Sequence, residues 1–142
     1  MLLSKCIHSI THQSINQSEY DVLILDNTPN TLVSNAVECK ALASIHANIR
    51  YVTKQTGGLS EARNECMKLT SSELIHFIDD DALVDYQFVQ NTLSCFERHT
   101  NLSVMGGRVL PDWSLVSRPS WLHDDALGYL SMLDFGDIEI CF

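Results

Sequence analysis

The chain has 142 residues, of which 45% are hydrophobic, and it carries a formal net charge of -9. Its length and composition suit one compact domain, and the negative charge argues against nucleic acid and anionic membranes as partners, because it repels phosphate. The five cysteines lack metal-ligand spacing, and no segment has the pattern of a signal peptide or a transmembrane span. We therefore expect a cytoplasmic protein whose cysteines are small buried hydrophobic residues.

Helices and strands are predicted to alternate in the first half of the chain. Leu2–Ile10 has the apolar spacing of an amphipathic helix, and Tyr20–Leu25 is a continuous apolar run that ends at Asp26. A second helix is expected over residues 32–40, and a short strand over Ile49–Val52. This alternation favours parallel strands with helical crossovers, whose functional loops gather at the carboxyl ends of the strands.

A glycine-rich turn follows in the stretch Gln55–Asn64. Gly57 and Gly58 permit backbone conformations that other residues avoid, and Ser60 stands where the N-cap of the next helix is expected. The unpaired N–H groups of that helix and Arg63 in its first turn would form a site for phosphate or carboxylate. An ordinary loop and capped helix is the alternative interpretation.

Three consecutive carboxylates follow an apolar segment in the middle of the chain. Leu74–Ile78 is predicted to be a buried strand, and Asp79, Asp80 and Asp81 come directly after it. In an open α/β sheet these acids would lie at the end where ligands bind, and a divalent cation would offset their mutual repulsion. A solvated turn of aspartates is the alternative on local spacing alone.

The last third of the chain is less regular. A helix is expected over Phe88–Arg98 and a strand over Leu102–Met105, whereas residues 111–142 have the weak periodicity of a long loop. Trp113 and Trp121 could form a wall for a flat-faced ligand such as a sugar, although loop tryptophans more often fill the edge of a core.

The ordered set GGLSEARN, LIHFIDDDA and MGGRVLPDW resembles the family 2 glycosyltransferases, which use nucleotide sugars and have the GT-A fold. The likeness is most specific between Gly57 and Ala82. It implies an α/β, Rossmann-like, mostly parallel sheet flanked by helices, without the strand that normally opens the family. Residues 1–142 would then be a single, partial nucleotide-sugar-binding domain, in which segment 111–142 leads toward an absent acceptor region.

The resemblance also implies roles for particular positions. Asp26 matches an acid that contacts the base or ribose, and Arg63 matches a contact to the nucleotide or its phosphates. Asp79 and Asp81 match the ends of the Asp-x-Asp motif that holds Mg²⁺ or Mn²⁺, with Asp81 as the expected direct ligand. The complete set of expected site residues is Asp26, Gly58, Arg63, Asp79, Asp80 and Asp81.

Two features depart from the family pattern. The chain begins within a predicted helix, where the family places a strand, and no residue matches the carboxylate general base, so the catalytic residues stay unassigned. The acids in the expected half of the chain read as solvated loop residues: Asp124, Asp125, Asp134 and Asp137. We expect an unpaired sheet edge to cause poor solubility or homodimerisation, with at most weak nucleotide binding and no turnover of a nucleotide sugar.

The leading hypothesis is a metal-assisted glycosyltransferase that moves a sugar from a nucleoside diphosphate sugar to a carbohydrate or lipid-linked acceptor. The alternative is a truncated, inactive module for nucleotide binding or protein interaction. A receiver-like or phosphohydrolase-like aspartate cluster is disfavoured. Those proteins place key aspartates after their first strand and a lysine or Ser/Thr at later strand ends, and no such residues are found in this sequence.

Overall fold

A computed structural model describes residues 2–27, 33–55, 57–136 and 140 of the chain. It forms two compact units, Met1–Arg98 and His99–Phe142, and each is described by itself below. Cys6 and Cys39 are buried free thiols, as the sequence predicts, and Cys66 and Cys95 are half-buried, whereas Cys141 lies outside the described residues. Within the described part of the chain, no helix is long and apolar enough to cross a membrane.

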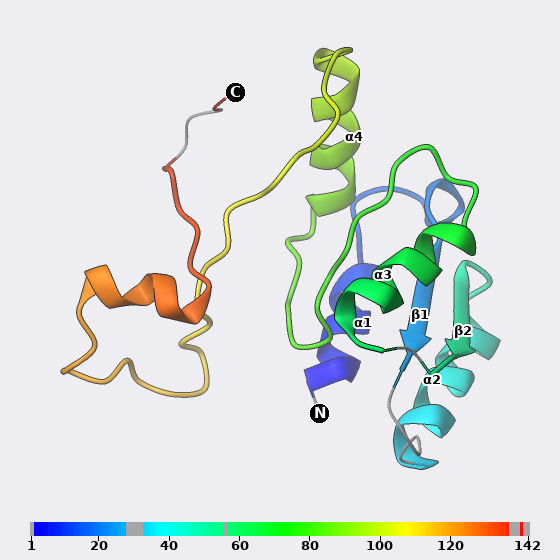
Figure 1. The fold of residues 1–142 in the computed structure, drawn as a ribbon, viewed down its shortest axis with the longest axis horizontal. Helices are drawn as coiled ribbons and strands as arrows, with labels where there is room; N and C mark the ends of the chain where they lie inside the picture. Colours follow the sequence, from blue (N-terminus) through cyan, green and yellow to red (C-terminus); the bar gives the residue numbers. More distant parts are fainter. Residues whose placement is uncertain (1, 28–32, 56, 137–139, 141–142) are drawn as a thin grey trace. The chain divides into compact units, whose positions relative to one another are not determined.

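The first unit contains most of the regular structure (Figure 1). Its elements in chain order are helix α1 (Leu2–Thr11), 3₁₀ helix η1 (Gln17–Glu19), strand β1 (Val22–Asp26), helix α2 (Val33–Ile45), strand β2 (Ile49–Thr53), helix α3 (Leu59–Lys68) and helix α4 (Phe88–Arg98). The predicted helices and the first two predicted strands are therefore confirmed, with shifts of a few residues at their ends.

Strands β1 and β2 form a two-stranded parallel sheet. Val22 lies opposite Ile49, and the register continues to Asp26 opposite Thr53. Alternate side chains of a strand point to the same face, so Ile24 and Tyr51, which are paired, share a face with Val22 and Ile49. That face carries the core, in which Ile49 packs with Ile7 of α1 and Cys39 of α2.

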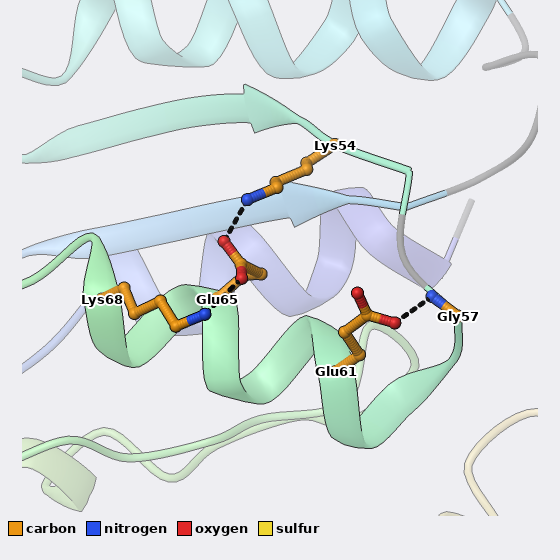
Figure 2. Close-up of polar contacts among 5 residues, drawn as sticks. All are labelled: Lys54, Gly57, Glu61, Glu65 and Lys68. Carbon is orange, nitrogen blue, oxygen red and sulfur yellow. Dashed lines mark hydrogen bonds and ion pairs between the residues drawn. The ribbon is translucent and has the colours of Figure 1, made fainter.

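Helix α3 belongs to the opposite face of the sheet and contacts β1. The side chains of Arg50 and Lys54 alternate with the core-facing residues of β2, and both reach α3. Arg50 donates to the Leu69 carbonyl at the end of the helix, at 2.9 Å, and Lys54 pairs with Glu65 (Figure 2). Helices thus flank both faces of a parallel sheet, which confirms the predicted α/β class.

The predicted strand Leu74–Ile78 is wrong. The segment has no backbone hydrogen bond to any other described residue, and the sheet among the described residues consists of β1 and β2. Leu74, Ile75 and Phe77 are 37%, 43% and 40% exposed rather than buried. An apolar run becomes a strand only when a neighbouring strand pairs with its backbone, and no described strand lies against this one.

The second unit has little regular structure in its described residues. The predicted strand Leu102–Met105 is wrong, because none of its residues belongs to a strand or a bridge. Among the described residues of this unit, an isolated antiparallel bridge joins Val109 to Leu133 instead. The 3₁₀ helix η2 (Asp124–Leu130) buries Leu127. Trp113 is half-buried and Trp121 is 73% exposed.

Candidate functional site

The carboxyl end of β1 presents Asp26, and β2 holds this residue through two hydrogen bonds. The Lys54 N–H donates to the Asp26 carbonyl at 3.0 Å, and the Tyr51 hydroxyl donates to Asp26 Oδ2 at 2.8 Å. Burial and the neighbouring Asp26 carboxylate raise the pKa of Tyr51 to about 12, so the phenol keeps its proton at neutral pH. Sequence reasoning missed Tyr51, because its contact with Asp26 depends on the strand register.

The amino end of α3 depends on Gly58. Gly58 has φ of 145° and ψ of -174°, which is accessible essentially only to glycine, and its carbonyl accepts the first helical hydrogen bond from Ala62 N at 3.0 Å. The prediction of Ser60 as N-cap is wrong, because Ser60 already lies within the helix. The backbone must turn sharply before the helix begins, and this conformation is far less strained for a glycine than for a serine.

The carboxylate of Glu61 lies beside Gly57 and Gly58, called the glycine turn below. Glu61 in the first turn of α3 accepts a hydrogen bond from the backbone N–H of Gly57 at 2.5 Å (Figure 2). A phosphate placed at this turn would therefore approach a negative charge as well as the helix dipole. Such a ligand needs cationic groups in addition to the helix N-terminus, and Arg63 is in position to supply one.

Arg63 brings together two parts of the sequence that the predicted site requires. Its Nη2 lies 3.3 Å from Asp79 Oδ1, and its guanidinium carbon lies 5.7 Å from the centre of the Phe77 ring. The side chains of Arg63 and Asp79 are 42% and 67% exposed. An ion pair this exposed contributes about 0 to 1 kcal/mol, so both groups can exchange partners at small cost.

The turn formed by Asp79–Ala82, called the aspartate turn below, contacts α1. The carbonyl of Asp79 accepts from Ala82 N at 3.1 Å and from the Cys6 thiol at 3.5 Å. The side chains of Asp79, Asp80 and Asp81 are exposed. Burial, and then the charges of these aspartates, raise the pKa of the Cys6 thiol to about 11. The turn therefore concentrates negative charge at the surface, where a cation could approach it.

The carboxylate oxygens of the aspartate turn are suitable ligands for Mg²⁺ or Mn²⁺, but they are too few to hold the ion by themselves. These ions prefer oxygen ligands, and Mg²⁺ is commonly held by one or two carboxylates together with phosphate oxygens and water. Within residues 2–27, 33–55 and 57–136, the histidine, cysteine and acidic side chains form no group of three that could hold a metal by itself. The aspartates would thus hold a metal together with the phosphates of a ligand, and the metal role of Asp79 and Asp81 stays a prediction.

A network of charged side chains fixes α3 against β2. Glu65 accepts from Lys54 and, at 2.7 Å, from Lys68 (Figure 2). These two hydrogen bonds lower the pKa of Glu65 to about 2, although burial opposes the shift. Arg63 lies two residues before Glu65 on the same helix, so this network helps to determine where the guanidinium of Arg63 is held. Sequence reasoning missed the network, although the Glu65 and Lys68 spacing is that of a helical ion pair.

The family of the chain follows from a comparison with known protein families. The sequence profile described as Glycosyl transferase family 2 matches residues 2–133 of the chain. The chain belongs to glycosyl transferase family 2. The match contains all six predicted site residues, from Asp26 to Asp81, and the α/β architecture of the first unit is consistent with part of a GT-A-like fold.

Curated relatives of this family 2 chain come from bacteria and an archaeon. The minor teichoic acid biosynthesis protein GgaB of Bacillus subtilis (strain 168) is 34% identical over 71% of the chain, and the uncharacterized glycosyltransferase EpsJ of the same organism is 30% identical over 73%. A glucosyl-dolichyl phosphate glucuronosyltransferase of Haloferax volcanii is 25% identical over 54%. The chain spans 11%, 29% and 24% of the length of these relatives, in that order.

The structure brings some of the predicted site residues of this family 2 chain together. Arg63 and Asp79 are in contact, and Gly58 begins the helix that carries Arg63. Asp26 ends β1, and α3 contacts that strand. Figure 1 shows that the chain after α3 runs back in the direction of the strands to a turn near the start of α3. In the second unit, Asp124 pairs with Arg118 at 2.7 Å, and no general base is assigned.

Proposed function

We propose that this family 2 chain binds a nucleoside diphosphate sugar beside the end of β1, the start of α3 and the aspartate turn, and that it transfers the sugar to an acceptor. The contact between Arg63 and Asp79 carries the proposal. It joins a cation in the first turns of a helix to a carboxylate of the turn, although 16 positions separate them in sequence. A diphosphate with its metal is suited by this combination, because arginine binds phosphate oxygens and carboxylates bind the metal.

Each site residue has a distinct part in the proposal. Asp26 accepts a hydrogen bond from the base or ribose, Arg63 donates to the diphosphate, and Gly58 lets the backbone approach it. Asp79 and Asp81 hold Mg²⁺ or Mn²⁺, with Asp80 between them. The metal, when bound, offsets the negative charge that develops on the departing nucleoside diphosphate.

Ligand binding would change the partners of Arg63 and Asp79. In the structure each offsets the charge of the other, at a gain of about 0 to 1 kcal/mol. With a diphosphate and a metal present, Arg63 faces phosphate oxygens and Asp79 faces the cation. Both new interactions are charge-assisted, and each is stronger than an exposed ion pair. The exchange therefore favours binding, whereas either ligand alone would leave one of the two charges without its partner.

The acceptor is proposed from the relatives. GgaB is named for the biosynthesis of a teichoic acid, and the Haloferax volcanii relative is named for a dolichyl phosphate substrate. We infer a carbohydrate or lipid-linked acceptor for this chain. The base of the donor is determined by the first experiment, and the sugar by testing which nucleotide sugars with that base are consumed.

A thermal-shift panel tests the proposal. UDP, GDP, ADP and CDP are each added with and without Mn²⁺, and we expect one of them to raise the melting temperature only when Mn²⁺ is present. A ligand at 100 times its Kd stabilises the folded protein by about 2.7 kcal/mol, which corresponds to several degrees. If no nucleotide raises the melting temperature, the proposed site is wrong. If one binds but its sugar nucleotides are not consumed with any acceptor, the chain is a nucleotide-binding module without transferase activity.

A further inference from the structure

We infer that Tyr51 is a positioning residue, whose hydroxyl holds the Asp26 carboxylate in the orientation that accepts a hydrogen bond from the nucleoside of the donor. The inference rests on the proposed function, because it assumes that Asp26 contacts the nucleoside. Its structural basis is the hydrogen bond from the Tyr51 hydroxyl to Asp26 Oδ2, at 2.8 Å.

The strand register explains why these two residues meet. Tyr51 lies opposite Ile24, and Asp26 lies opposite Thr53, so Tyr51 and Asp26 are diagonal neighbours on the same face of the sheet. Diagonal neighbours have Cβ atoms about 7 to 8 Å apart, which a long aromatic side chain can span. A phenol at position 51 therefore reaches the carboxylate at the end of the adjacent strand.

The ring of Tyr51 is itself held in place. It packs against the core cluster of Ile7, Cys39 and Ile49, so the hydroxyl cannot move away without disturbing the core. The backbone of Asp26 is held as well, because its carbonyl accepts from Lys54 N at 3.0 Å. Main chain and carboxylate of Asp26 are thus both fixed from β2, and the phenol proton is retained well above neutral pH.

A carboxylate at the end of a strand otherwise rotates about two side-chain bonds. Binding a ligand would then require that rotation to stop, and the lost conformational entropy would weaken the complex. Tyr51 removes part of this cost in advance by engaging one oxygen. Functional side chains held by a supporting hydrogen bond bind and react more effectively than unsupported ones. Tyr51 therefore supports the nucleoside contact without touching the ligand.

The test compares Tyr51→Phe with a matched control, Tyr20→Phe. The Tyr20 hydroxyl also donates a partly buried hydrogen bond, to the Ile10 carbonyl at 2.9 Å, but Tyr20 precedes β1 and so lies at the opposite end from Asp26. Both variants lose one hydroxyl and keep the ring. Calorimetric titration in the presence of Mn²⁺, with whichever of UDP, GDP, ADP and CDP binds in the thermal-shift panel, should show a Kd raised about 3- to 10-fold in Tyr51→Phe, the range of one ordinary hydrogen bond. Tyr20→Phe should bind like the wild type.

Asp26→Asn and the double variant with Tyr51→Phe separate the possible outcomes. If Tyr51 acts through Asp26, the tyrosine substitution should change the Kd less than 2-fold in the Asp26→Asn background, roughly the limit of additivity. If Asp26→Asn weakens binding but Tyr51→Phe and Tyr20→Phe both bind like the wild type, the inference is overturned while the proposed function stands. If the wild type binds none of UDP, GDP, ADP and CDP, or Asp26→Asn binds like the wild type, the proposed nucleoside contact fails and the inference fails with it.

Discussion

Replacing Arg63 with alanine is the sharpest test of the site, because it should affect ligand binding far more than folding. The guanidinium of Arg63 makes one exposed ion pair with Asp79 and lies over the Phe77 ring. The exposed ion pair contributes about 0 to 1 kcal/mol and the cation–π contact about 0.5 to 1 kcal/mol. Arg63→Ala should therefore lower the free energy of unfolding by no more than about 2 kcal/mol.

The effect on the complex should be larger. A hydrogen bond from Arg63 to a phosphate is charge-assisted on both sides, and losing it costs about 1 to 3 kcal/mol. Since 1.4 kcal/mol corresponds to a factor of ten, the Kd for the nucleoside diphosphate should rise about 5- to 150-fold. Arg63→Lys, which keeps the charge but not the planar donor group, should fall between the wild type and alanine.

Arg50→Ala provides the matched control for this prediction. Arg50 makes one exposed hydrogen bond, to the Leu69 carbonyl at the carboxyl end of α3, so its loss should affect stability alone. Calorimetric titration with UDP and GDP in the presence of Mn²⁺ gives the affinities, and urea denaturation gives the free energies of unfolding. If Arg63→Ala binds as well as Arg50→Ala and is merely less stable, Arg63 is a structural residue and the proposed phosphate contact is wrong.

Three further predictions concern the metal, the charged network and the glycine turn. Asp81→Asn should abolish Mn²⁺-dependent nucleotide binding in calorimetric titration, and Asp80→Asn should weaken it less. Equal titration curves for Asp81→Asn and the wild type would rule out Asp81 as a metal ligand. The lysine partners lower the pKa of Glu65 from 4.5 to about 2, so its contribution to stability is complete above pH 4.5 and disappears as the pH falls through 2. The difference in melting temperature between the wild type and Glu65→Gln should shrink over that interval, and a constant difference would exclude an electrostatic contribution. Gly58→Ala should lower the free energy of unfolding, measured by urea denaturation, by about 1 to 3 kcal/mol, because alanine is strained at φ of 145°. Gly57→Ala displaces only a flexible carboxylate and should lower it less. Similar losses in the two variants would contradict this account.

Several features of the protein followed from the sequence alone because they are determined locally. The 3.6-residue spacing of apolar side chains predicted α1 and α4, and the apolar runs ending at Asp26 and at Val52 predicted two strands. The order of the glycine turn, helix and aspartates likewise indicated the family, which the comparison confirmed. Each of these patterns lies within a short stretch of chain, where neighbouring residues suffice to determine the structure or the match.

Local patterns were less reliable where the structure depends on backbone geometry. Ser60 has the chemistry of an N-cap, yet the helix begins at Leu59 after Gly58, because the approach to α3 needs a φ of 145°. Leu74–Ile78 has the composition of a buried strand, but no described segment pairs with its backbone. A hydrogen-bonded ladder requires a second strand, and the composition of the first cannot supply it.

The contacts within the candidate site were decided by the tertiary structure. Arg63 meets Asp79 because α3 and the aspartate turn are brought together across 16 positions, and Tyr51 meets Asp26 because the register sets them diagonally on adjacent strands. A shift of that register by one residue would turn Tyr51 to the other face of the sheet and remove its contact with Asp26. The sequence by itself determined which side chains are present and which elements carry them. Their distances depend on how those elements pack, because contacts between residues far apart in sequence form only when the whole unit folds.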